Sequence, residues 1–119
     1  MHNFRELIVW KQSRALVKDV YVLTAELPSS EKFNLSAQMQ SSAVSVSSNI
    51  AEGSGRGSDI DFARFLDMAM GSAHELESQL LVSFDLGFLN QERTDQVVQQ
   101  LWEIERMIVG LINKLRGSK

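Results

Sequence analysis

The sequence predicts an all-α protein, an antiparallel up-down-up-down four-helix bundle that takes up residues 1–119 as one domain. Apolar residues recur every three or four positions through four long segments, which is the spacing of one helical face. The 119 residues include one proline, seven glycines and no cysteine. That composition is too poor in turn residues for a β-sandwich, and it excludes disulfides and thiolate metal sites. The short loops between the segments favour antiparallel neighbours.

The first helix is predicted over residues 4–27, because the segment has no glycine and Pro28 cannot continue it. Its apolar residues are spread around most of the helical wheel, with Leu7 and Val22 on one side and others nearly opposite. Since a peripheral bundle helix needs only one apolar stripe, we expect a second burial partner and therefore self-association. Scattered surface apolar residues are the alternative explanation. The candidate interface residues are Val9, Trp10 and Tyr21.

The second helix is predicted over residues 35–52, with Asn34 or Ser36 as its N-terminal cap. One face carries apolar residues at steps of three and four: Leu35, Met39, Ala43, Val46 and Ile50. The alternating glycines of residues 53–57 then end the predicted helix. Because this stretch follows a helix rather than a strand, it indicates a flexible turn and not a phosphate-binding loop.

The third and fourth helices are predicted over residues 59–86 and 91–115. Ser58 and Asn90 stand at their starts as caps, and Gly87 is placed to follow the last turn of the third helix. The fourth helix carries the heptad-like stripe typical of bundle packing: Val97, Leu101, Ile104, Ile108, Leu111 and Leu115.

Polar side chains form a second stripe beside the apolar faces of the second and third helices. Its members are Gln38, Ser45, Asn49, Glu52, Ser72 and Glu75. They indicate either a solvated face, or a groove of small residues where two helices approach closely, or a polar pocket between the helices. A pocket would require the carboxylates to face a cation such as Arg56 or Arg64, since buried charges need partners.

Charge is unevenly distributed in the predicted bundle, although the net charge is only −3. The pole that holds the start of the first helix and the end of the fourth collects nine basic and six acidic residues, against three and nine at the other pole. Such a pole can present a basic surface to phosphates, while helix dipoles and chance would also place cations there. The candidate nucleic-acid-binding residues are Arg5, Lys11, Arg14, Arg56, Lys114 and Arg116.

Catalytic and metal-binding motifs are missing from the sequence. There is no Walker loop, no HExxH and no nucleophile elbow, and the adjacent His74 and Glu75 would point about 100° apart on a helix. We therefore predict no enzymatic activity, no catalytic, cofactor-binding or metal-binding residues, and no small-molecule substrate. No apolar run approaches ~18 residues and the first residues lack the apolar core of a signal peptide. A cytoplasmic protein without a membrane partner is expected.

Four blocks of residues resemble a known family: Phe4-x-x-Leu7-x-Val9-Trp10, Pro28-x-x-Glu31-x-Phe33-x-Leu35-x-x-Gln38, Ser45-Val46-x-x-Asn49-Ile50-Ala51-Glu52-Gly53 and Gly71-Ser72-x-x-Glu75-Leu76-Glu77. They look like the small bacterial four-helix-bundle proteins, ribosomal-protein-like, that are encoded by intervening sequences in large-subunit rRNA genes. The accessory variability protein of retroelements has a related fold. The resemblance covers nearly the whole chain, and the Asn-Ile-Ala-Glu-Gly block is its most specific part. It implies a homopentamer without enzymatic activity.

One departure from the family pattern bears on the partner. Gln40 and Ser41 stand where the family usually has a pair of arginines, which weighs against an RNA or reverse-transcriptase partner. Four polar positions of the family are kept, which favours a structural role for the stripe: Gln38, Asn49, Glu52 and Glu75. The function expected is a self-assembling scaffold or interaction module. A nucleic-acid-binding accessory protein is the alternative.

Overall fold

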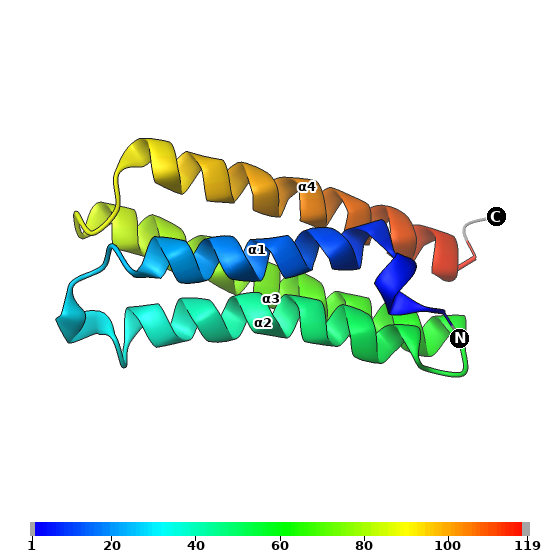
Figure 1. Cartoon of the computed structure of the whole chain (residues 1–119). Coiled ribbons are helices and arrows are strands. Elements are labelled where there is room, and N and C mark those ends of the chain that lie inside the picture. Colours follow the sequence, from blue (N-terminus) through cyan, green and yellow to red (C-terminus); the bar gives the residue numbers. More distant parts are fainter. Residues whose placement is uncertain (1, 118–119) are drawn as a thin grey trace.

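The structure, a computed structural model, describes residues 2–117 and contains four α-helices and no strand in that range (Figure 1). The helices are α1 (Ile8–Thr24), α2 (Leu35–Ser54), α3 (Asp59–Asp85) and α4 (Gln91–Leu115). Two short 3₁₀ helices, η1 (Phe4–Glu6) and η2 (Ser29–Glu31), precede α1 and α2. The predictions of an all-α protein and of four helices are confirmed.

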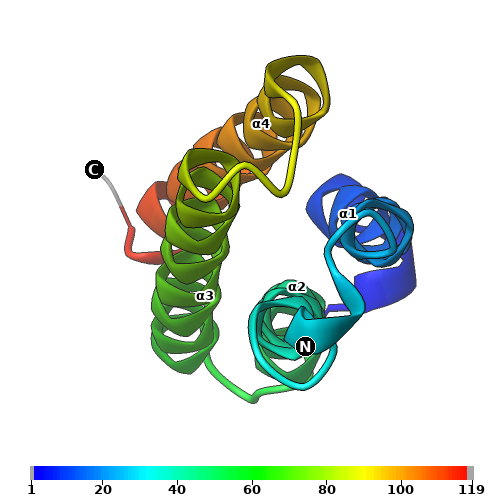
Figure 2. The same cartoon turned by 90° about the vertical axis from the view of Figure 1, so that its left-hand side faces the viewer.

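Viewed along the helices, the molecule has two flanks (Figure 2). α1 and α2 lie on one side and α3 and α4 on the other, and each helix lies beside the next one in the chain. Within residues 2–117, no helix combines the length and apolarity that crossing a bilayer requires.

The first helix is shorter than predicted at both ends. Residues 4–6 form η1, and Leu7 is extended (φ −73°, ψ 124°), so the α-helix begins only at Ile8. At the other end α1 stops at Thr24, where a series of tight backbone turns takes over before Pro28 is reached. Pro28 therefore follows the helix at a distance and does not itself end it.

The helix caps are partly as predicted. Ser58 and Asn90 each accept a hydrogen bond from the backbone N–H three residues later, at 3.1 and 2.8 Å. At α2, Asn34 is the N-cap residue as predicted, but its side chain bonds neighbouring side chains and not a backbone N–H. Ser36, the other candidate, is buried inside the helix. A carboxylate oxygen of Glu31 accepts from the first amide of α2, at 3.4 Å.

The core contains most of the apolar faces predicted for the second and fourth helices, together with buried side chains of α1 and α3. Its largest fully buried side chains include Leu16, Leu23, Met39, Ile50, Phe62, Leu66, Leu76, Leu80, Leu101 and Ile104. Burying a side chain of this size contributes about 1.5–3 kcal/mol. The packed core fixes the positions of α2 and α3, and therefore also the positions of the polar side chains that these two helices carry.

Gly53 is a point of close approach between α2 and α3. The helix continues through it to Ser54, so the predicted break at this glycine is two residues early. A Cβ added at Gly53 would lie 2.6 Å from Cβ of Phe65 and 2.9 Å from Cδ1 of Phe62. The absence of a side chain is what lets the two helices meet here.

Candidate interaction surfaces

The centre of the polar stripe is a hydrogen-bonded seam between α2 and α3. The hydroxyls of Ser45 and Ser72 lie 2.8 Å apart, and the side-chain amide of Asn49 donates to the backbone carbonyl of Ser45 at 2.9 Å. The hydroxyl of Ser42, one turn before Ser45 on α2, donates to buried Gln79 at 3.0 Å. All of these side chains are buried or half-buried. The seam is thus a groove of small residues whose polar groups satisfy one another.

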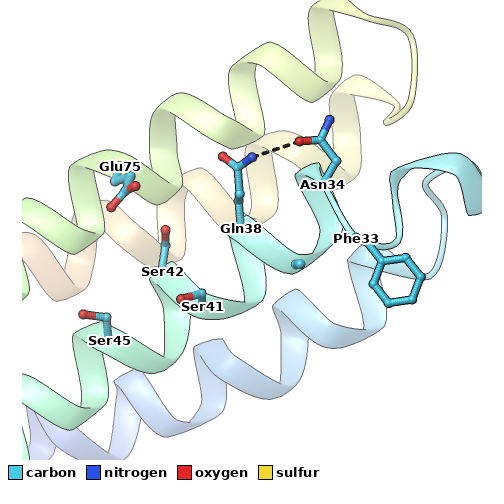
Figure 3. A pocket seen from close by; sticks show the side chains of 8 residues that line it. Phe33, Asn34, Gln38, Ser41, Ser42, Ser45 and Glu75 are labelled. Carbon is cyan, nitrogen blue, oxygen red and sulfur yellow. Dashed lines mark hydrogen bonds between the residues drawn. The ribbon is translucent and has the colours of Figure 1, made fainter.

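The outer members of the stripe are exposed. Gln38 donates to Asn34 at 3.0 Å, and Glu52 forms an ion pair with Arg56 at 2.9 Å. Glu75 faces α2 across a shallow hollow of about 320 Å³, well away from Arg56 (Figure 3). The structure therefore brings Ser45, Ser72 and Asn49 together. The exposed side chains of Gln38, Glu52 and Glu75 do not meet in one charged pocket.

The three predicted interface residues on α1 have different environments. Val9 is 4% exposed and lies in the core, so the prediction that it faces outward is wrong. Trp10 is half-buried, with its ring 4.8 Å from that of Phe4 and the guanidinium of Arg14 above it. Tyr21 is 49% exposed. Only Trp10 and Tyr21 remain available to a partner.

The six candidate cations at the basic pole fall into two groups. Arg56 is paired with Glu52, and Arg116 is paired with Asp67. Within residues 2–117 no carboxylate oxygen lies within 4.0 Å of the charged groups of Arg5, Lys11, Arg14 and Lys114. Lys119, which also counts toward this pole in the sequence, lies outside the described residues.

Between α3 and α4 lies a groove that sequence reasoning missed, with a volume of about 510 Å³. We call it the acidic groove; the side chains that matter here are Glu77, Leu81, Asp85, Trp102 and Glu105. The indole N–H of Trp102 donates to a carboxylate oxygen of Glu77 at 3.1 Å. Leu81 and Trp102 are 46% and 51% exposed. Apolar surface and negative charge therefore occur together on this side of the molecule.

Glu105 is the most perturbed acid of the groove. Its Oε2 is buried without a hydrogen-bond partner among residues 2–117, and its other oxygen lies 3.8 Å from Nε2 of His74. Burial raises the pKa of Glu105, the charge of Glu77 and a hydrogen bond with it raise it further, and His74 opposes the shift. Glu105 therefore keeps its proton more readily than an exposed glutamate would.

A spacing of three residues is the signal that could have revealed this groove. His74 and Glu77 are three apart on α3, and Trp102 and Glu105 are three apart on α4, so each pair shares a helical face. Among the described residues, no group of three histidine or acidic side chains is arranged to hold a metal ion.

Comparison with known proteins identifies a family and a similar fold. The family model described as 23S rRNA-intervening sequence protein matches residues 5–110. Among solved structures, a protein of unknown function from the S23 ribosomal protein family of Bacteroides thetaiotaomicron is 24% identical. The match covers 88% of this chain and 98% of that one, with a TM-score of 0.82, and shows that the two share a fold. No curated protein matches the chain.

Proposed function

The chain belongs to the 23S rRNA-intervening sequence protein family, and on that premise we propose that it is a non-enzymatic, self-assembling scaffold or interaction module. The proposed assembly is a homopentamer, as the resemblance in the sequence implies, and its proposed location is the cytoplasm. The assembled form, and not a single chain, would bind the cellular partner.

One observation carries the proposal: large apolar side chains stay exposed although the core is already filled. Tyr21 on one flank, and Leu81 and Trp102 on the other, are each about half exposed. Aromatic side chains are enriched in the centres of protein interfaces, where burying them removes much apolar area from water. Two separate apolar surfaces on opposite flanks favour association of several copies.

The building block of the assembly is the antiparallel up-down-up-down bundle that the sequence predicts. Contacts between α1 and α4 support this arrangement. Asp19 of α1 accepts from Gln100 at 2.9 Å, and Glu26, in the turn that follows α1, pairs with Arg93, which comes earlier in α4. Because the order of the partners is reversed along the two helices, these contacts fit opposite chain directions.

Native mass spectrometry of the full chain tests the proposal. We expect a principal species at five times the 13.4 kDa mass of one chain. A spectrum that contains the monomer alone at micromolar concentration would contradict self-assembly. A different multiple would retain the scaffold and correct the number of copies.

Nucleic-acid binding is a second candidate function, and we propose it on the unpaired cations of the basic pole. Arg5, Lys11, Arg14 and Lys114 are exposed and have no ion-pair partner among residues 2–117. Phosphate binding through such residues weakens steeply with salt, because counterions are released. Gel shifts with a structured RNA at low and high salt test it. Absence of any shift at low salt excludes this second function.

A further inference from the structure

The exposed surface of α1 and α2 carries cations around an apolar patch. Lys11, Arg14 and Lys18 follow one another at steps of three and four on the outer face of α1. Together with Tyr21 and Val44 we call them the basic flank. Tyr21 is 49% and Val44 is 39% exposed. Among the described residues none of the three cations has a carboxylate within 4.0 Å.

Tyr21 and Val44 belong to one patch although they come from different helices. The amide of Gln40 donates to the hydroxyl of Thr24 at 3.0 Å, which sets the register of α2 against α1. Val44 comes one turn after Gln40 and Tyr21 one turn before Thr24. Because α1 and α2 run in opposite directions in the proposed bundle, a turn forward on α2 and a turn back on α1 move the same way along the molecule. Val44 and Tyr21 therefore lie at a similar height.

The acidic groove has the complementary character. Glu77, Asp85 and Glu105 surround the exposed apolar side chains of Leu81 and Trp102. Among the described residues no lysine or arginine lies within 4.0 Å of these three carboxylates, and His74 beside Glu105 is the one basic group that does. A cation supplied from outside would lower the repulsion between Glu77 and Glu105.

The two surfaces lie on opposite flanks at the same height along the bundle. Lys18 is next to Asp19, which is bonded to Gln100 of α4. Trp102, two residues further, is bonded to Glu77 in the acidic groove. Gln100 and Trp102 are two residues apart on α4, so at 1.5 Å of rise per residue the bond to Asp19 and Trp102 lie about 3 Å apart along the helix direction.

Resting on the self-assembly proposed above, we infer that the basic flank of one copy docks into the acidic groove of the next copy. Opposite charges and matching apolar patches favour this pairing over the contact of a surface with itself, which would bring like charges together. The contact is heterologous, because it joins two different surfaces. Since the two surfaces lie at the same height along the bundle, each added copy is rotated relative to the last but shifted little along the bundle axis. That is the condition under which a chain of copies closes into a ring instead of growing into a filament.

The flanks are large enough for a stable contact. The chain measures 46 × 23 × 20 Å along its principal axes, so a flank can supply the ~800 Å² per partner that specific interfaces bury. Tyr21 and Trp102 would be the aromatic side chains at its centre.

Charge reversal tests the inference. We expect Arg14→Glu with Lys18→Glu, or Glu77→Lys with Asp85→Lys, to weaken association at least about 100-fold and to bring the light-scattering mass to 13.4 kDa. The chain that carries all four substitutions should recover the wild-type mass, because its surfaces are again complementary with their signs exchanged. Lys32→Glu, in the loop outside both surfaces, should leave the mass unchanged, and circular dichroism checks that every variant is folded.

The outcomes separate this inference from the proposed function. A monomeric wild type contradicts self-assembly itself. An oligomeric wild type whose mass is unchanged in both folded pair variants leaves self-assembly standing and overturns the assignment of the surfaces. The assignment is also overturned if the Arg14→Glu, Lys18→Glu variant keeps its mass but loses salt-sensitive binding to a structured RNA, because the flank would then face phosphates.

Discussion

Gly53 shows how a single residue positions two helices. Its missing side chain leaves room for Phe62 and Phe65, which would lie 2.9 and 2.6 Å from an added Cβ. We predict that Gly53→Ala lowers the free energy of unfolding by about 1–3 kcal/mol, because the overpacked α2–α3 contact must open. Urea denaturation followed by circular dichroism measures the change.

Gly71→Ala is the matched control. Gly71 also lies inside a helix, but an added Cβ would meet nothing within 4 Å. The substitution should raise the free energy of unfolding by about 0.5–1 kcal/mol, since alanine favours the helix over glycine. If both alanine variants were stabilised alike, the close approach at Gly53 would be contradicted.

Glu105 is predicted to make stability depend on pH. Its pKa is raised in the folded chain, so folding takes up a proton between the unfolded pKa and the raised folded pKa, and stability falls as pH rises through that window. Glu105→Gln removes this titration. The variant should be more stable than the wild type at pH 7, with the advantage shrinking toward pH 4.

Thermal melts from pH 4 to 8 measure the difference. Glu103→Gln on the same helix is the control, because Glu103 is 51% exposed and paired with Arg106 at the surface. Losing the ion pair between Glu103 and Arg106 should change the free energy of unfolding by no more than about 0.5 kcal/mol. A stability difference between Glu105→Gln and wild type that stays constant with pH would contradict the raised pKa.

At the scale of the elements, the end of α3 shows a local signal that was read correctly from the sequence. Gly87 has φ +82°. Its N–H donates to the carbonyl of Phe84 at 2.9 Å, and the N–H of Phe88 donates to that of Ser83 at 3.0 Å. This pair of bonds is a Schellman motif, which requires a left-handed residue.

We predict that Gly87→Ala destabilises the chain by about 1–2 kcal/mol, the cost of a left-handed conformation for a residue with a Cβ. Gly110→Ala, in α4 where an added Cβ meets nothing within 4 Å, should be neutral or stabilising. Equal effects at the two positions, measured by thermal unfolding, would contradict the motif.

Local signals predict elements well when the cause is local. Ser58, Asn90 and Gly87 act through bonds to neighbours within five residues, so their roles can be read from the sequence. The start of α1 cannot, because the extended Leu7 depends on how η1 packs. The helical wheel places Val9 on the same side as Leu16 and Val20, and all three are buried, so the error lay in choosing Val9 as an interface residue.

The interaction surfaces belong to the whole molecule and were predictable only in part. Exposed Tyr21 was expected from the excess of apolar residues in the first helix. The acidic groove was not, because Glu77 and Glu105 are 28 positions apart and meet only through the packing of α3 on α4. The polar stripe was recognised, but only the structure shows that its centre is a closed seam.

Association is the central claim, and the molar mass of the wild-type chain in solution tests it most directly. Size-exclusion chromatography with light scattering, at loading concentrations from about 1 to 500 μM, should return five times 13.4 kDa over most of the range. A mass of 13.4 kDa at every concentration would contradict the proposed scaffold.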